Sequence, residues 1–95
     1  MAEILARADA ATLSVVAMDY DAPETRRLVM LCRELQRASG DGPFFLSCRT
    51  AGKLLGIDHL TAWRRLSVLR EDRLIQCVEP GTKKKATRYR YIGGQ

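Results

Sequence analysis

Residues 47–73, SCRTAGKLLGIDHLTAWRRLSVLREDR, predict two helices joined by a tight turn. The hydroxyl of Ser47 can accept a hydrogen bond from a free backbone N–H, so this residue suits the N-cap of the first helix. Gly56 can take the left-handed conformation that ends a helix, and Asp58 can cap the helix that follows. A short helix, a turn near glycine and a second helix are the elements of a helix-turn-helix.

The second helix of this pair has an apolar stripe and a basic opposite side. The stripe consists of Ala62, Leu66 and Leu69. Thr61, Arg64 and Val68 lie roughly opposite the stripe, with Arg65 at its flank. Trp63 falls at the border of the stripe, where we expect it to pack, under a later hairpin, rather than to stack on bases. The spacing therefore predicts a helix that buries one side and exposes cations on the other.

A longer helix is expected before the pair, over residues 21–39. Asp21 and Glu24 have capping-box spacing, and Pro23 is tolerated in the first turn of a helix. Gly40 is a natural stop. The apolar face of this helix consists of Leu28, Leu31, Cys32 and Leu35. We expect the helix to pack across the pair as a scaffold, with its arginines on a solvated face.

Three short strands are expected around the helix pair. Residues 44–46 suit an edge strand, because they are too few for a helix and directly precede the Ser47 cap. Residues 74–79 and 87–92 predict a β-hairpin whose loop carries three adjacent lysines. The second strand alternates strictly, which places Tyr89 and Tyr91 on one face and Arg88 and Arg90 on the other. The tyrosines either cover the core, which this alternation favours, or stack single-stranded bases.

This order of elements resembles the winged helix-turn-helix superfamily over residues 21–92. The residues that carry the resemblance are Ala51-Gly52, Leu55-Gly56-Ile57, Ala62, Leu66, Leu69, Leu74-Ile75 and the hairpin GTKKKATRYRY. The resemblance implies an α+β, mostly helical fold of three helices and a small antiparallel sheet. It also implies that the second helix of the pair, about residues 58–70, enters the major groove while the hairpin loop, the wing at residues 80–88, contacts the backbone. Arg73 stands where many members of the superfamily have glycine.

The resemblance assigns DNA contacts to two groups of residues. Recognition falls to His59, Thr61, Arg64 and Arg65, and the wing supplies Lys83, Lys84, Lys85 and Arg88. A third group, Arg49, Thr50 and Lys53 on the first helix of the pair, suits contacts with the phosphate backbone. The alternative for the arginines is a solvated helix face, with Arg65 paired to a nearby acid. His59 has no partner at ligand spacing, so we expect no metal site.

The charge is uneven along the chain. Residues 1–46 hold five Lys/Arg against seven Asp/Glu, which gives 5 − 7 = −2. Residues 47–95 hold eleven Lys/Arg against four Asp/Glu, which gives 11 − 4 = +7. A basic half that contains the helix pair points to a polyanionic partner, with nucleic acid ahead of an anionic membrane surface.

These features favour a double-stranded DNA-binding module, in transcriptional regulation or in phage- or plasmid-type replication. The alternatives are a winged-helix module for protein–protein interaction within a larger complex, and a single-strand nucleic-acid binder. We expect no enzyme and no cofactor, because the chain has one histidine, no Gly-rich phosphate loop and no nucleophile beside a base. No apolar run is long enough for a membrane span.

The chain ends and the cysteines allow further expectations. Residues 1–20 are expected to be an arm or linker, and residues 93–95 a frayed tail. A homodimer through residues 1–39 is expected, because a single module of this size usually contacts too short a site alone. The three cysteines are odd in number and far apart, which predicts reduced thiols in a cytoplasmic protein. The expected context is bacterial or phage-like and nucleoid-associated.

Overall fold

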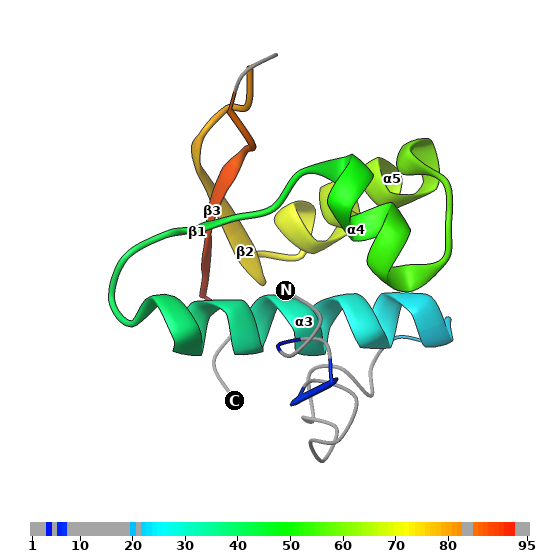
Figure 1. Ribbon diagram of the computed structural model, residues 1–95, viewed down its shortest axis with the longest axis horizontal. Helices are drawn as coiled ribbons and strands as arrows, with labels where there is room; N and C mark the ends of the chain where they lie inside the picture. The colour runs from blue at the N-terminus through cyan, green and yellow to red at the C-terminus, as the bar shows by residue number, and fades with distance from the viewer. Residues whose placement is uncertain (1–3, 5, 8–19, 21, 83–84, 93–95) are drawn as a thin grey trace.

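The computed structural model describes Ile4, residues 6–7, residue 20, residues 22–82 and residues 85–92. The elements in chain order are α3 (Pro23–Ser39), β1 (Phe44–Phe45), α4 (Cys48–Leu55), α5 (His59–Glu71), β2 (Ile75–Glu79) and β3 (Arg88–Tyr91). The helix α3 runs along one side of the molecule, with α4 and α5 over one half of it and the three strands over the other (Figure 1). This is the three-helix winged helix-turn-helix arrangement that the sequence predicts.

The first helix begins later than predicted and without the predicted cap. The N-cap residue of α3 is Ala22, which has no side-chain acceptor, and Pro23 occupies the first turn. Asp21 lies outside the described residues, and the carboxylate of Glu24 instead accepts a hydrogen bond from Arg65. The predicted stop is confirmed, because Gly40 at the C-cap has a φ of 67°.

The helix pair forms as its caps predict. The Ser47 hydroxyl accepts from the Thr50 N–H at 3.0 Å, and the Asp58 carboxylate accepts from the Thr61 N–H at 2.8 Å. Gly56 ends α4 in the left-handed conformation, with φ 71° and ψ 31°. The turn then passes so close to α4 that a Cβ atom added to Gly52 would lie 2.7 Å from the Ile57 carbonyl oxygen.

The C-terminal end of α5 forms a Schellman motif around Arg73. The Arg73 N–H donates to the Arg70 carbonyl at 3.0 Å, and the Leu74 N–H donates to the Leu69 carbonyl at 2.9 Å. This pair of bonds requires a left-handed residue after the helix, and Arg73 has a φ of 62°. A glycine at this position would take the same conformation without strain.

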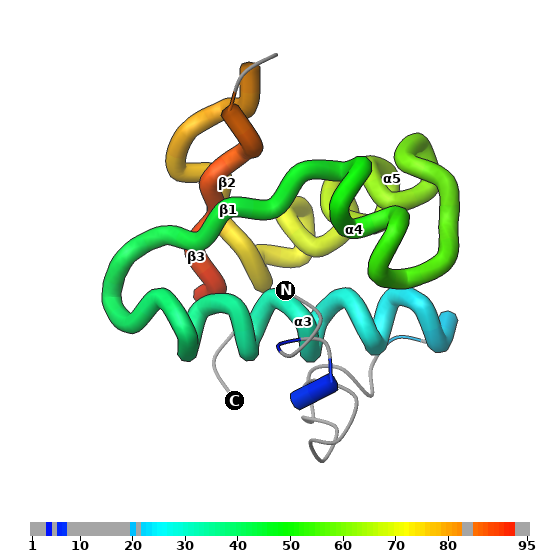
Figure 2. Tube along the Cα trace, in the orientation of Figure 1, coloured from blue at the N-terminus to red at the C-terminus, as the bar shows by residue number. Residues whose placement is uncertain are grey.

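The three strands form one antiparallel sheet in the order β1-β3-β2. Phe44 pairs with Tyr89 in the register of β1 and β3, and the two rings pack with centroids 6.1 Å apart. The predicted edge strand and hairpin are thus confirmed. The strands of the hairpin rise away from α3, so the wing lies at the end of the molecule opposite that helix (Figure 2).

The core lies where α3, the helix pair and the inner face of the sheet meet. The stripe of α5 is buried as predicted, and so are Phe44, Leu46, Ala51, Leu55, Leu74, Ile75 and Tyr89. The buried surface of α3 is wider than its predicted face, because Val29 and Met30 are buried in addition. Gln36 ties α3 to the sheet, since its side chain donates to the Gly40 and Gly42 carbonyls and accepts from the Tyr91 N–H at 2.9 Å.

The predictions for the chain ends fall largely outside the described residues. Ile4 packs against the core, and the Tyr20 hydroxyl donates to Asp72 at 2.7 Å. Residues 93–95 are not described. Within the described part of the chain, no helix is both long and apolar enough to cross a membrane.

Candidate nucleic-acid interface

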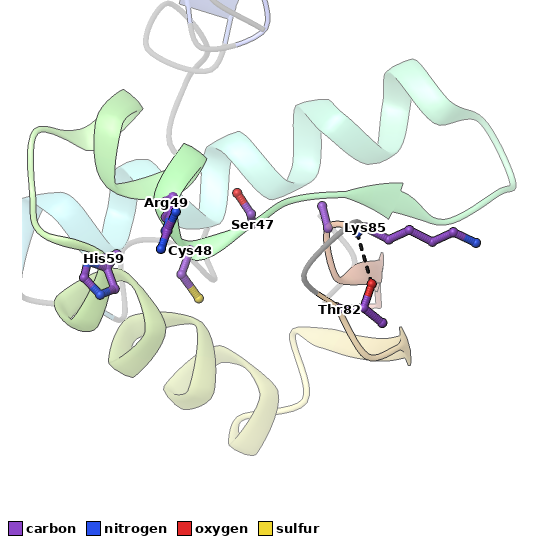
Figure 3. A pocket seen from close by; sticks show the side chains of 7 residues that line it. Ser47, Cys48, Arg49, His59, Thr82 and Lys85 are labelled. Atoms are coloured by element: carbon purple, nitrogen blue, oxygen red, sulfur yellow. Dashed lines mark hydrogen bonds between the residues drawn. The ribbon is translucent and has the colours of Figure 1, made fainter.

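A groove separates the N-terminal ends of α4 and α5 from the wing. It has a volume of about 820 Å³ and is lined by Ser47, Cys48, Arg49, His59, Thr82, Lys85 and Ala86. The first four residues come from the helix pair, and the last three come from the wing on the opposite side (Figure 3). None of the lining residues is acidic. A groove of this composition suits a phosphate backbone, because the free N–H groups of a helix N-terminus attract anions.

The first helix of the pair offers two exposed cations, Arg49 and Lys53. Neither makes an ion pair with another described residue. Thr50, the third residue predicted here, is half-buried. Its hydroxyl oxygen accepts a hydrogen bond from the Ser47 hydroxyl at 2.9 Å, so the side chain is already engaged within the helix cap. Of the three predicted backbone contacts on this helix, Arg49 alone lines the groove.

The wing is closed by hydrogen bonds among its polar residues. The Thr82 N–H donates to the Lys85 carbonyl at 2.9 Å, and the Lys85 N–H donates to the Thr82 hydroxyl at 3.1 Å. The side chain of Lys85 extends away from α4 and α5 (Figure 3). Lys83 and Lys84 lie outside the described residues. Of the three predicted wing lysines, the structure therefore describes only Lys85. This residue lines the groove.

The two adjacent arginines of α5 have different surroundings. Arg64 is exposed and makes no ion pair with another described residue. Arg65 is half-buried and forms an ion pair with Glu24 of α3 at 3.1 Å. The alternative considered for Arg65, pairing with a nearby acid, is thus the arrangement found.

The other two predicted recognition residues lie at the start of α5. His59 is exposed and lines the groove. Thr61 is half-buried, and its hydroxyl donates to the Asp58 carboxylate at 2.9 Å. The Thr61 backbone N–H also donates to this carboxylate. The two bonds, of which the backbone one has the larger effect, hold the pKa of Asp58 below its ordinary value. The hydroxyl donor of Thr61 is used within the cap, which leaves the hydroxyl oxygen as an acceptor and the methyl group for any contact outside.

Arg88 lies on the outer face of the sheet rather than at the groove. Its guanidinium donates to Glu79 at 3.0 Å and lies 5.0 Å from the centre of the Phe45 ring. The two contacts hold the side chain in place. Arg88 is therefore a structural residue of the hairpin in this conformation, apart from the groove-lining cations.

The prediction that Trp63 packs in the interior is wrong. Its side chain is 57% exposed, beside Leu60 at 59%. Trp63 is one residue after Ala62, which turns it about 100° away from the buried stripe. Leu60 was not predicted at the interface, although it precedes Arg64 by one helical turn and so shares its exposed face.

The tyrosines of β3 cover the core, as their alternation favours. Tyr89 is 5% exposed, and burial raises the pKa of its hydroxyl to about 12. Tyr91 is half-buried against the core, and burial raises its pKa as well. The ring of Tyr89 is therefore not available to stack on a base, and that of Tyr91 is only partly accessible. Burial also raises the pKa of Cys32 to about 12 and that of Cys48 above its ordinary value, which disfavours a reactive thiolate at the groove.

No protein-family model matches the chain, and neither a curated protein nor a solved structure is significantly similar to it.

Proposed function

We propose that the chain binds double-stranded DNA, with the first half of α5 in the major groove and the wing on the phosphate backbone. The observation that carries the proposal is the groove between the helix pair and the wing, which Arg49 and His59 line and whose lining residues include no acid. Arg64 continues this surface on the exposed side of α5. A helix with its side chains is about 10–12 Å across, which fits a major groove of about 12 Å.

On the same grounds we propose membership of the winged helix-turn-helix superfamily and a role in transcriptional regulation or in phage- or plasmid-type replication. Glu71 is exposed at the end of α5, where it would repel phosphates. The contact is therefore expected from the N-terminal residues of the helix, as in other helix-turn-helix proteins. A cytoplasmic location and the absence of catalysis remain predictions.

A homodimer through residues 1–39 is also a proposal. The exposed large apolar side chains of the described residues are Phe45, Leu60, Trp63, Val68, Val78 and Ile92. None of them belongs to α3, so that helix offers no apolar patch for a partner. An apolar dimer contact within residues 1–39 would therefore depend on residues before α3.

The second candidate is a protein-interaction module, and the exposed pair of Leu60 and Trp63 favours it. Apolar side chains of this size are common at protein interfaces. The two candidates differ in their response to salt, because DNA binding releases counterions from the duplex while an apolar contact does not. Single-strand binding, the third alternative, depended on Tyr89 and Tyr91 as stacking platforms, and these side chains pack against the core instead.

The test is fluorescence anisotropy of a random-sequence duplex and of a single strand of equal length, each titrated with the full chain. We expect micromolar binding of the duplex at about 50 mM salt and much weaker binding at about 200 mM. Arg49→Ala should weaken it several-fold. Arg73→Gly is the matched control, because it removes one positive charge about 20 Å from His59, beyond the other end of α5.

Three results would contradict the proposal. They are the absence of saturable duplex binding, a preference for the single strand, and equal losses in Arg49→Ala and Arg73→Gly.

A further inference from the structure

Two large apolar side chains stand exposed in the middle of the surface assigned to DNA. Leu60 and Trp63 are 59% and 57% exposed, and they are three residues apart, so they are neighbours on one side of α5. Phe45, the next most exposed of the described large apolar side chains at 51%, has the Arg88 guanidinium over its ring. Among the described residues, no guanidinium or ammonium group lies over the Trp63 ring in this way.

Helical spacing places the pair between two polar groups. Trp63 follows His59 by four residues and therefore lies one turn further along the groove side of the helix. Leu60 precedes Arg64 by four residues and shares its outer side. Around the helix the order is thus His59, Trp63, Leu60, Arg64, so the apolar pair occupies the centre of the face that His59 and Arg64 border.

The position of Leu60 and Trp63 between His59 and Arg64 favours a polyanion over an acid-free apolar protein surface as the partner that covers them. Residues 59–68 of α5 contain no acidic side chain. The neighbouring groove contains none either. An apolar patch bordered by His59 and Arg64, on a stretch of helix without acidic side chains, complements a polyanion that presents apolar groups at its centre. The floor of the DNA major groove does so at one kind of base pair, because thymine alone carries a methyl group there.

We propose that Leu60 and Trp63 are specificity-determining residues that select thymine through its 5-methyl group, beside a base contacted by Arg64. The inference rests on the proposed binding of duplex DNA. Guanine is the base that an arginine fork contacts most often. The three residues fall within little more than one helical turn, about 5.4 Å, which spans about two base pairs. The preferred sites should therefore contain thymine within about two base pairs of a guanine.

The experiment begins with selection of preferred duplexes from a random pool by the wild-type chain. In the selected duplex each thymine is then replaced, one at a time, by deoxyuridine, which removes only the methyl group. Affinity is measured by anisotropy for the wild type and for the Leu60→Ala/Trp63→Ala variant. Phe45→Ala is the matched control, because it removes an exposed aromatic ring from the outer face of the sheet.

We expect deoxyuridine at one or two positions to weaken wild-type binding about fourfold, as the loss of one buried methyl group predicts. The double variant should bind the thymine duplex more weakly and should not distinguish thymine from deoxyuridine. Phe45→Ala should keep the wild-type response. Far-UV circular dichroism checks that the variants fold, which their exposed positions favour.

Several results would overturn the inference. They are a pool without enrichment, a change below twofold at every thymine, or a double variant as sensitive as the wild type. Unchanged DNA affinity in the double variant, together with loss of binding to a protein partner, would assign the pair to that partner instead. If no duplex binds at all, the proposed function itself fails, which is a distinct outcome.

Discussion

Arg73 has a left-handed backbone, which an arginine adopts only at a cost in free energy. The conformation costs a residue with a Cβ atom about 1–2 kcal/mol, and glycine avoids this cost. The superfamily resemblance had already marked Arg73 as a departure from glycine, and the Schellman bonds at the end of α5 give the physical reason for glycine there. A chain that keeps arginine at this position gives up some stability.

Arg73→Gly should therefore stabilise the protein. We expect the free energy of unfolding to rise by about 0.5–1 kcal/mol, because the greater entropy of glycine in the unfolded chain offsets part of the gain. Urea denaturation of the wild type, Arg73→Gly and Arg73→Ala measures this. Arg73→Ala removes the same charge but keeps a Cβ atom, so equal stability of the two variants would refute the backbone explanation.

Single residues were predictable from sequence where their role is local. Ser47, Gly56 and Asp58 act within one helical turn of their own positions, and each caps its helix as its residue type predicts. Trp63 was mispredicted because its burial depends on what packs beside α5, which periodicity alone does not specify. Asp21 was mispredicted as a cap because α3 begins two residues after it, and helix ends are set within a residue or two by competing local contacts.

At the scale of elements, the close approach of α4 to the turn depends on Gly52. Helix propensity alone predicts that Gly52→Ala stabilises α4 by about 1 kcal/mol. We expect the opposite sign, a loss of about 1–3 kcal/mol, because the new methyl group would lie 2.7 Å from the Ile57 carbonyl oxygen. Urea denaturation decides the sign. Lys53→Ala, at the next and exposed position, is the control and should change stability little; a more stable Gly52→Ala variant would refute the clash.

The cap of α5 should make stability depend on pH. Hydrogen bonds from the Thr61 N–H and hydroxyl lower the pKa of Asp58 in the folded state. A lowered pKa means that the carboxylate stabilises the folded protein above the ordinary pKa of 3.8, and that this contribution is lost as the pH falls through the folded pKa. The stability difference between the wild type and Asp58→Ala should thus be larger at neutral pH than in acid. Urea denaturation at several pH values tests this, and a difference independent of pH would contradict it.

The elements themselves were predictable because their signals lie within continuous segments. Helical periodicity identified α4 and α5, and strict alternation identified β3, each within about two residues. The shortness of residues 44–46 indicated an edge strand, but the sheet order β1-β3-β2 is seen only in the folded chain. The wide buried surface of α3 was not predictable. Val29 and Met30 are buried by tertiary packing, which the spacing within the helix does not specify.

At the scale of the whole molecule, the fold gathers basic residues from separate elements around one groove. Arg49, His59 and Lys85 come from α4, α5 and the wing. The sequence predicted that these residues belong to a DNA contact, but not which of them line a common groove. Arg65 and Arg88 were indistinguishable from the others by type, and only the folded chain pairs them with Glu24 and Glu79.

The wing should determine much of the salt dependence of DNA binding. Each lysine that neutralises a phosphate adds about 0.9 to the slope of log K against log salt. The triple variant Lys83/Lys84/Lys85→Ala should therefore lower the magnitude of that slope by up to about 3. Anisotropy of a random-sequence duplex over a series of salt concentrations measures it. An unchanged slope would place the three lysines away from the DNA.

The central claim, that the exposed side of α5 contacts DNA, is tested most directly by its two adjacent arginines. Arg64 and Arg65 have the same charge and are neighbours in sequence, but only Arg65 is held by Glu24. The measurement is the Kd for a preferred duplex, by anisotropy, of the wild type, Arg64→Ala and Arg65→Ala. We predict that Arg64→Ala raises the Kd about tenfold and that Arg65→Ala leaves it nearly unchanged. Equal effects of the two substitutions, or no effect of either, would contradict the account.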